Sequence, residues 1–253
     1  MTFPIDIHIG SIIVPSHLIL DVIAFYAATR YYLHKKSNHP GMVSGEDRWT
    51  LIIGAAVGAL IGSRLLASLE DIPYTLAHFS LMAIYAQETI VGGIIGGILG
   101  VEIAKKLKSI KISTGDLFVY PLILGIMVGR VGCFLTGVSD HTAGLPCSLA
   151  WCFDQGDGIA RHPTALYEIV FLGLFWIVLA KMEKRIFLEN GALFRLFVIG
   201  YSLFRLSVDF IKPRETLFLG LSSIQIGALF IAIFYLAELM WRYHHRPFPG
   251  KPI

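Results

Sequence analysis

Charged residues are scarce in this sequence. They make up 15% of the 253 residues, whereas a soluble domain of this size carries about a quarter. This deficit excludes a cytosolic enzyme, a disordered chain and a nucleic-acid-binding protein, and a net charge of +3 is too small for a DNA-binding surface. With only three cysteines, the fold cannot depend on a disulfide framework. The chain is instead 55% hydrophobic with a mean hydropathy of +0.67, which indicates an integral membrane protein of one domain, residues 1–253.

Long apolar segments predict the architecture. Each contains about 20 mostly apolar residues, enough for a helix that crosses a bilayer. They lie at approximately 11–33, 49–69, 89–107, 116–137, 163–182, 191–211 and 221–241. The stretch 72–87 is interrupted by Pro73, His78 and Gln87, so we expect an arm at the membrane interface, with an eighth span as the alternative. The sequence therefore predicts an all-α polytopic membrane protein with about seven transmembrane helices.

The distribution of Lys and Arg predicts the orientation. Most of them lie in the first, third and fifth connections and in the C-terminal tail, whereas the opposite connections hold only Arg161, Lys212 and Arg214. Because basic loops stay on the cytoplasmic side, the N-terminus is expected outside and the C-terminus inside. The N-terminus has no basic stretch followed by a cleavage site, so the first span is expected to be retained.

Three arginines fall inside the predicted spans. Arg64, Arg130 and Arg205 all lie in the outer half of the membrane in this orientation. A charge deep in lipid costs at least about 2.5 kcal/mol, so such residues face the protein interior or a wet cavity. We interpret them as a site for an anion from the outer leaflet, such as a phospholipid phosphate. The alternative is structural pairing, for which Asp209 is placed four residues after Arg205.

Other polar residues begin their helices at the same outer level. Glu88 precedes the third span, and His162, Tyr167 and Glu168 open the fifth. Glycines recur every four residues in the second and third spans, which predicts close helix packing. Gly92 and Gly93, near Glu88, are also candidates for lining the anion site.

The longest outer connection, 138–161, is a candidate functional loop because of its length. Its region holds several carboxylates and imidazoles, at Asp140, His141, Asp154, Asp157 and His162. Their spacing matches no metal-ligand signature, and such residues in Gly-rich loops usually form turns. We therefore expect no metal site and no cofactor.

The cysteines all fall toward the outer side. Cys147 and Cys152 can pair, which leaves Cys133 at the outer end of the fourth span. A free cysteine there is expected to be a small apolar filler. The alternative is a nucleophilic thiol activated by Arg130.

Three motifs resemble the prolipoprotein diacylglyceryl transferase family. They are GRVGCFLTG at 129–137, RHPTALYE at 161–168 and FRLSVDFIKPRE at 204–215, with a weaker match in IVGGIIGG at 90–97. The resemblance implies transfer of a diacylglyceryl group from phosphatidylglycerol to the lipobox cysteine thiol of a pre-lipoprotein, with release of glycerol phosphate. The expected setting is the plasma (inner) membrane, with the site facing the periplasm. The protein is expected to be a monomer without a nucleic-acid partner.

The resemblance also implies roles for individual residues. Arg130 would bind the phosphate and glycerol head group, and Arg205, oriented by Asp209, would assist the departing phosphate. The other expected pocket residues are Arg64, Gly92, Gly93, Gly129, Gly137, His162, Tyr167 and Glu168.

This chain departs from the family pattern at several positions. Val91 replaces the family's usual histidine, an apolar residue near Ile19 replaces its tyrosine, and Cys133 replaces an asparagine. The resemblance therefore identifies no general base for the acceptor thiol. Outer-side groups with suitable chemistry are Asp140, His141 and His162.

These departures suggest a divergent member or a paralogue. The alternatives are the same lipid donor with a different acceptor, or a non-catalytic lipid-binding or transport protein. An almost purely apolar inner half disfavours a transport path.

Overall fold

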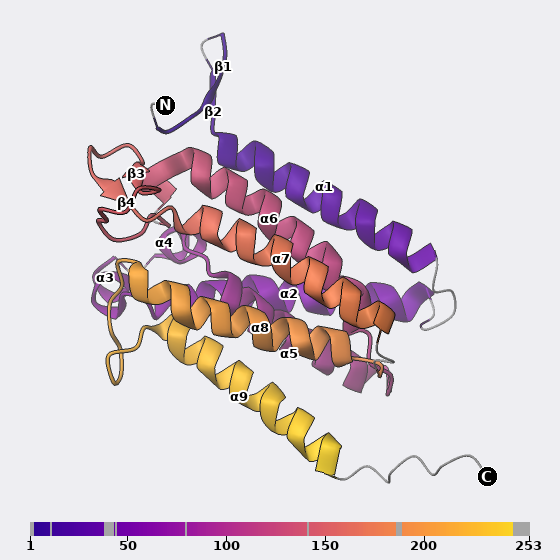
Figure 1. The fold of residues 1–253 in the computed structure, drawn as a ribbon. Helices are drawn as coiled ribbons and strands as arrows, with labels where there is room; N and C mark the ends of the chain where they lie inside the picture. Colours follow the sequence, from indigo (N-terminus) through magenta and orange to yellow (C-terminus); the bar gives the residue numbers. More distant parts are fainter. Residues whose placement is uncertain are drawn as a thin grey trace, which may run out of the picture. The chain divides into compact units, whose positions relative to one another are not determined.

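The computed structural model describes residues 3–10, 12–37, 43, 45–78, 80–140, 142–185 and 189–244. Long helices dominate these residues, and one falls in each predicted apolar segment (Figure 1). They are α1 (Ser16–Ser37), α2 (Gly45–Ser68), α5 (Ile90–Leu107), α6 (Val119–Thr136), α7 (Thr164–Arg185), α8 (Ala192–Val208) and α9 (Ser223–His244).

Length and composition qualify four helical stretches as membrane spans. They are Gly45–Ser68, Gly115–Asp140, Thr164–Arg185 and Ser223–Arg242. The second stretch joins α6 to the short 3-10 helices η1 (Gly115–Phe118) and η2 (Gly137–Asp140). The all-α, multi-pass membrane class is thus confirmed, while the count of seven spans and their orientation stay predictions.

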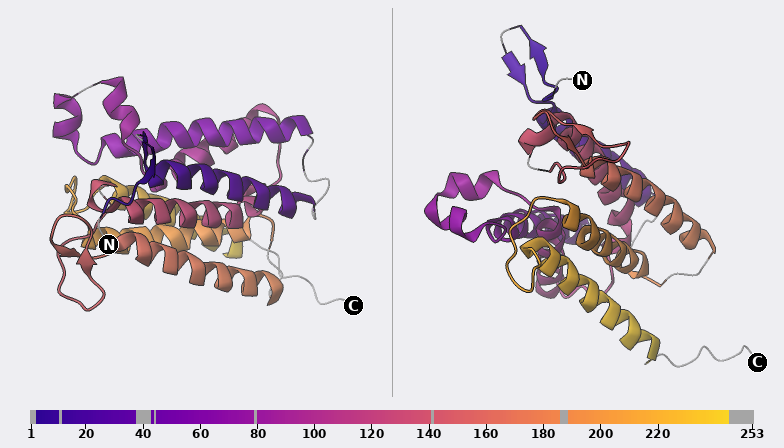
Figure 2. Two further views of the ribbon diagram at one scale, coloured as in Figure 1. Left: turned by 90° about the horizontal axis from the view of Figure 1, so that it is seen from above. Right: turned by 60° about the vertical axis from the view of Figure 1, so that its left-hand side comes forward.

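The N-terminal segment differs from its prediction. The first span was expected from about residue 11, but β1 (Ile7–Ile9) and β2 (Ile12–Val14) form an antiparallel hairpin, and α1 begins only at Ser16. The hairpin extends beyond the start of α1 (Figure 2). The boundary falls at Pro15, which favours extended backbone in the residue before it and is tolerated only at a helix start.

The chain divides into two compact units. The first contains Met1–Trp49, Lys108–Phe194 and Ser207–Arg214. In it, α6 packs against both α1 and α7 (Figure 1). Tyr31, Tyr120 and Trp176, one from each helix, meet in tilted and edge-to-face contacts with ring centroids 5.0–6.4 Å apart. This aromatic contact fixes the three helices that carry the site described below.

The second unit contains Thr50–Leu107, Arg195–Leu206 and Glu215–Ile253. Glycines of α2 and α5 face one another, and a methyl group added at Gly58 would meet the Gly100 Cα at 3.0 Å. The predicted close packing of the glycine stripes is therefore present. Helix α9 adds an apolar cluster in which Val91 lies with Ile224 and Ala228.

The stretch 72–87 forms two short helices, α3 (Ile72–Ala77) and α4 (Leu81–Ala86). Six residues make a helix of about 9 Å, far shorter than a membrane crossing. The expected interfacial position of this arm stays a prediction.

Candidate functional site

Arg130 is paired inside the first unit. Its Nε lies 2.9 Å from Oε2 of Glu168 on α7, and the two side chains are only 8% and 1% exposed. The packing of α6 on α7 thus gives the intramembrane arginine a carboxylate partner. Such a pair holds the guanidinium plane in one orientation, because Arg presents its donors in a rigid fork.

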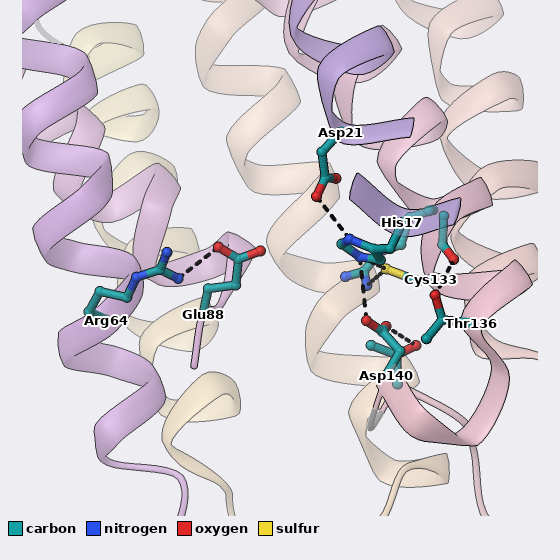
Figure 3. A network of polar contacts seen from close by, with 10 residues as sticks. His17, Asp21, Arg64, Glu88, Cys133, Thr136 and Asp140 are labelled. Carbon is teal, nitrogen blue, oxygen red and sulfur yellow. Dashed lines mark hydrogen bonds and ion pairs between the residues drawn. The ribbon is translucent and has the colours of Figure 1, made fainter. Parts of the chain in front are cut away.

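His17, Asp21, Cys133 and Asp140 form a polar cluster (Figure 3). Arg130 Nη1 lies 3.5 Å from the Cys133 sulfur, and His17 Nε2 approaches the same sulfur at 3.5 Å. His17 Nε2 is also 3.4 Å from Asp140 Oδ1, while His17 Nδ1 lies 2.8 Å from Asp21 Oδ2. A histidine on α1, a cysteine on α6 and an aspartate in η2 therefore converge.

His17 is absent from the residues that the sequence suggested for the site. Its signal was its spacing from Asp21, since residues four apart share a helix face. Close approach of the helices brings it to α6: a Cβ at Gly132 would meet the His17 Cα at 3.3 Å. Cys133 is consequently more than the expected apolar filler, because its sulfur has an imidazole and a guanidinium as neighbours.

The outer loop is held by its own contacts. Cys147 and Cys152, whose pairing the sequence left open, form a disulfide. Tyr167 OH accepts a hydrogen bond from Trp151 Nε1 at 2.9 Å and lies 3.1 Å from His162 Nδ1. His162 and Tyr167 therefore lie in contact, while their role in the site stays a prediction.

Two carboxylates of this loop form turns, as expected. Asp154 Oδ1 accepts the backbone N–H groups of residues 156, 157 and 158 at 2.8–3.0 Å. Asp157 pairs with Arg161 at 2.6 Å, and this hydrogen-bonded guanidinium lowers the pKa of Asp157. His141 lies outside the described residues.

Two motif glycines have different surroundings. Gly137 adopts a φ of +67°, and an added Cβ would overlap the Gln155 carbonyl oxygen, so it is needed for the turn that follows α6. Gly129 faces more open space, with the nearest atom to an added Cβ being Asp21 Oδ1 at 3.8 Å.

Arg64 has partners in the second unit. Its Nη1 lies 2.7 Å from Glu88 Oε2 (Figure 3). The same nitrogen donates to the Gln87 carbonyl at 3.0 Å. The Glu88 side chain is 63% exposed, so solvent screens this pair. Gly92 is tightly packed, since an added Cβ would meet Thr89 Oγ1 at 2.7 Å, whereas Gly93 has no such neighbour closer than 3.8 Å.

Arg205 and Asp209 are both buried, at 4% and 2% exposure. Arg205 belongs to the second unit and Asp209, in the 3-10 helix η3 (Asp209–Ile211), to the first. The meeting of Arg64, Arg130 and Arg205 around one phosphate stays a prediction.

The fold and the buried arginine pair define a class, that of multi-pass membrane proteins with a charged site held between apolar helices. Comparison with known proteins gives the family. Residues 4–241 match the family described as prolipoprotein diacylglyceryl transferase. The chain belongs to this family, which identifies it as a transferase.

Named relatives agree over most of the chain, and each is called a phosphatidylglycerol–prolipoprotein diacylglyceryl transferase. The protein of Nitrosomonas europaea is 29% identical, with 98% of this chain and 92% of the relative aligned. That of Bordetella parapertussis is 31% identical (86% and 85% aligned), and that of Klebsiella pneumoniae 28% (91% and 88%).

Proposed function

We propose that this protein transfers a diacylglyceryl group from phosphatidylglycerol to the lipobox cysteine of a pre-lipoprotein and releases glycerol phosphate. The names of its relatives support this activity. The observation that carries it is the buried pair of Arg130 and Glu168 within two of the family motifs. A fixed guanidinium at this position suits a phosphate that gains charge during the reaction.

The reaction needs a sulfur nucleophile and a stabilised leaving group. The acceptor thiolate attacks the glyceryl carbon, the bond between that carbon and the phosphate oxygen breaks, and its electron pair leaves on the oxygen. Arg130, oriented by Glu168, binds the head group and stabilises that charge. Arg64 and Arg205, the latter with Asp209, are the other residues to which this proposal gives a role toward the phosphate.

The remaining site residues shape the pocket in this proposal. Gly129 in α6 and Gly137 directly after it flank Arg130 and Cys133 in the sequence, while Gly92 and Gly93 belong to the first turn of α5. His162 and Tyr167, which contact one another, would form its wall beside the outer loop.

The proposed setting is the plasma (inner) membrane. Seven spans with the N-terminus out and the C-terminus in would place the site toward the periplasm, where the phospholipid donor and the pre-lipoprotein signal peptide meet. The protein would act as a monomer without a nucleic-acid partner.

One observation favours a second candidate, the same donor with a different acceptor. Val91 occupies the position of the family's usual histidine and lies in an apolar cluster, 3% exposed. A valine cannot accept the proton of an acceptor thiol. Either another group takes that proton, or the acceptor is not a thiol.

Complementation tests the proposal. The chain is expressed in cells depleted of their own transferase, and diacylglyceryl-modified pre-lipoprotein is measured by its mass. The wild type should restore the modification, and Arg205→Lys should lose most of it because lysine cannot make a planar two-pronged contact. Arg195→Lys is the matched control, since Arg195 is a buried α8 arginine paired with Glu238 at 3.2 Å.

Unmodified pre-lipoprotein beside an inserted, folded wild-type chain would refute the proposed activity. Modification of another molecule by the lipid would favour the second candidate. Lipid binding without any product would indicate a non-catalytic lipid-binding or transport protein.

A further inference from the structure

We propose that His17, Cys133 and Asp140 bind a zinc ion that presents an open coordination position to the acceptor thiol. All three belong to the first unit. Their ligand atoms, one imidazole nitrogen, one sulfur and one carboxylate oxygen, lie within 4.8 Å of one another. Imidazole, thiolate and carboxylate are the ligands that zinc takes in proteins.

Two of the three separations match those of a tetrahedral zinc site, and the third, between the Cys133 sulfur and the Asp140 carboxylate, is within 4.8 Å. With zinc–ligand distances of about 2.0–2.3 Å, neighbouring ligand atoms in a tetrahedron are about 3.3–3.6 Å apart. His17 Nε2 lies 3.5 Å from the Cys133 sulfur and 3.4 Å from Asp140 Oδ1. Little movement is therefore needed for these atoms to share one ion.

Each ligand has a supporting partner. His17 Nδ1 faces Asp21 Oδ2 at 2.8 Å, which leaves Nε2 as the metal-binding nitrogen. Asp140 Oδ2 accepts the Thr142 hydroxyl at 2.8 Å, so its other oxygen faces the histidine. Zinc-binding histidines almost always have such a carboxylate or carbonyl behind them, and ligating carboxylates are in turn hydrogen-bonded.

Charge and access also fit. A thiolate from Cys133 and the Asp140 carboxylate balance the two positive charges of zinc, and Arg130 Nη1 at 3.5 Å can donate to the metal-bound sulfur. Side-chain exposures of 25% for His17 and 17% for Asp140 leave the cluster reachable. Three protein ligands leave one tetrahedral position open, as in catalytic zinc sites.

A second group, Cys147, Cys152 and His162, also has ligand atoms close together. Its two sulfurs are joined to each other in a disulfide. Since zinc binds the thiolate, that group is unsuited to the ion while the disulfide is intact.

The role of the ion rests on the proposed function. When the lipobox sulfur binds zinc, its S–H proton is released to water, because a coordinating thiol is deprotonated. The thiolate then forms the new S–C bond at the glyceryl carbon, and the phosphate leaves with the electrons of the broken C–O bond. Zinc thereby supplies the thiol activation that Val91 cannot.

Metal analysis tests the site without any activity. Full-length protein is purified in detergent, its affinity tag is removed, and zinc per chain is measured by mass spectrometry. The wild type should hold one zinc ion, and Cys133→Ser and His17→Ala should lose it. Asp21→Asn should weaken zinc affinity about 10–100-fold, as changes behind a ligand do.

Thr136→Val is the matched control. Thr136 lies three residues after Cys133 and donates its hydroxyl to the Gly132 carbonyl at 3.0 Å, so its replacement should leave the zinc content unchanged. Cobalt substitution gives a second readout, since a sulfur-to-cobalt charge-transfer band should appear in the wild type and in Thr136→Val and be missing in Cys133→Ser. Thermal unfolding of each variant identifies any that fails to fold.

Addition of a lipobox peptide tests the role. Its cysteine should intensify the charge-transfer band of the cobalt protein, whereas the same peptide with alanine should not. Wild-type protein that lipidates its substrate but holds no zinc, or a zinc content that Cys133→Ser leaves unchanged, would overturn the metal site and leave the transferase proposal standing. Zinc at the site without lipidation would instead defeat the transferase proposal.

Discussion

The pair of Arg130 and Glu168 allows a structural role to be separated from a functional one. We consider Arg130→Gln, Glu168→Gln and the double variant. The native pair has a separation of 2.9 Å and exposures of 8% and 1%, so solvent screens it little. Removing one partner of such a buried pair costs about 3–5 kcal/mol, because the other charge is left without its counterion.

The double variant should behave differently. Gln is isosteric with Glu168 and shorter than Arg130, and the two neutral glutamines leave no buried charge from the pair. Replacing a buried pair as a whole is often close to neutral. We therefore expect each single variant to lose about 3–5 kcal/mol of unfolding free energy, and the double variant to lose clearly less than either. All three variants should lack transferase activity. Arg130→Gln and the double variant have no guanidinium at this position, and in Glu168→Gln the Arg130 guanidinium is no longer held in its orientation.

The assay combines unfolding of the detergent-purified proteins, followed by circular dichroism, with lipidation of a pre-lipoprotein substrate. Stability restored in the double variant without activity would match the assignment of Arg130 to the phosphate. Restoration of both stability and turnover would refute it, since the arginine would then serve only to neutralise Glu168.

Two further predictions concern packing and pH. A Cβ at Gly96 would overlap the Gly58 carbonyl oxygen, whereas the atom nearest to a Cβ at Gly97 is 3.6 Å away. Gly96→Ala should therefore lose about 1–3 kcal/mol of unfolding free energy. In the same melting experiment, Gly97→Ala should stay near the wild type. The hydrogen bond from Arg161 is the main cause that lowers the pKa of Asp157 from its ordinary value of 3.8. The ionised carboxylate therefore stabilises the loop fully at pH values above 3.8. This stabilisation is lost as the pH falls through the lower pKa of the folded state. The protection of the outer-loop amides against hydrogen exchange, taken relative to the intrinsic exchange rate at each pH, should fall on acidification in the wild type. Asp157→Asn should remove that part of the fall, and an unchanged response would contradict this.

Much of the helical layout was predictable from the sequence, because apolar runs of membrane length have few other stable conformations. The N-terminal boundary was not, since the residues of β2 are as apolar as those of α1 and hydropathy alone does not distinguish them. Pro15 was the local signal, and it marks where the hairpin ends and the helix begins.

The site was predictable where a single residue carries a large energetic cost. A charged Arg130 in an apolar helix needs a partner or a wet cavity, and Glu168 is that partner. The contact of His17 with Cys133 was not predictable in this way. It depends on the register of α1 against α6, which the sequence of either helix leaves open.

Gly132 explains why this register can form. The glycine lies between Arg130 and Cys133 in the motif, and an added Cβ would meet both the Cα and the ring Cδ2 of His17, at 3.3 and 3.4 Å. A larger residue would push α1 outward, and the imidazole would then lose its approach to the sulfur. In these proposals, one short segment of α6 supplies a guanidinium for the phosphate and a thiol for the metal, and its glycine leaves space for the histidine that faces the thiol. This explains why a motif that resembles a phosphate site in sequence also carries the inferred zinc ligand.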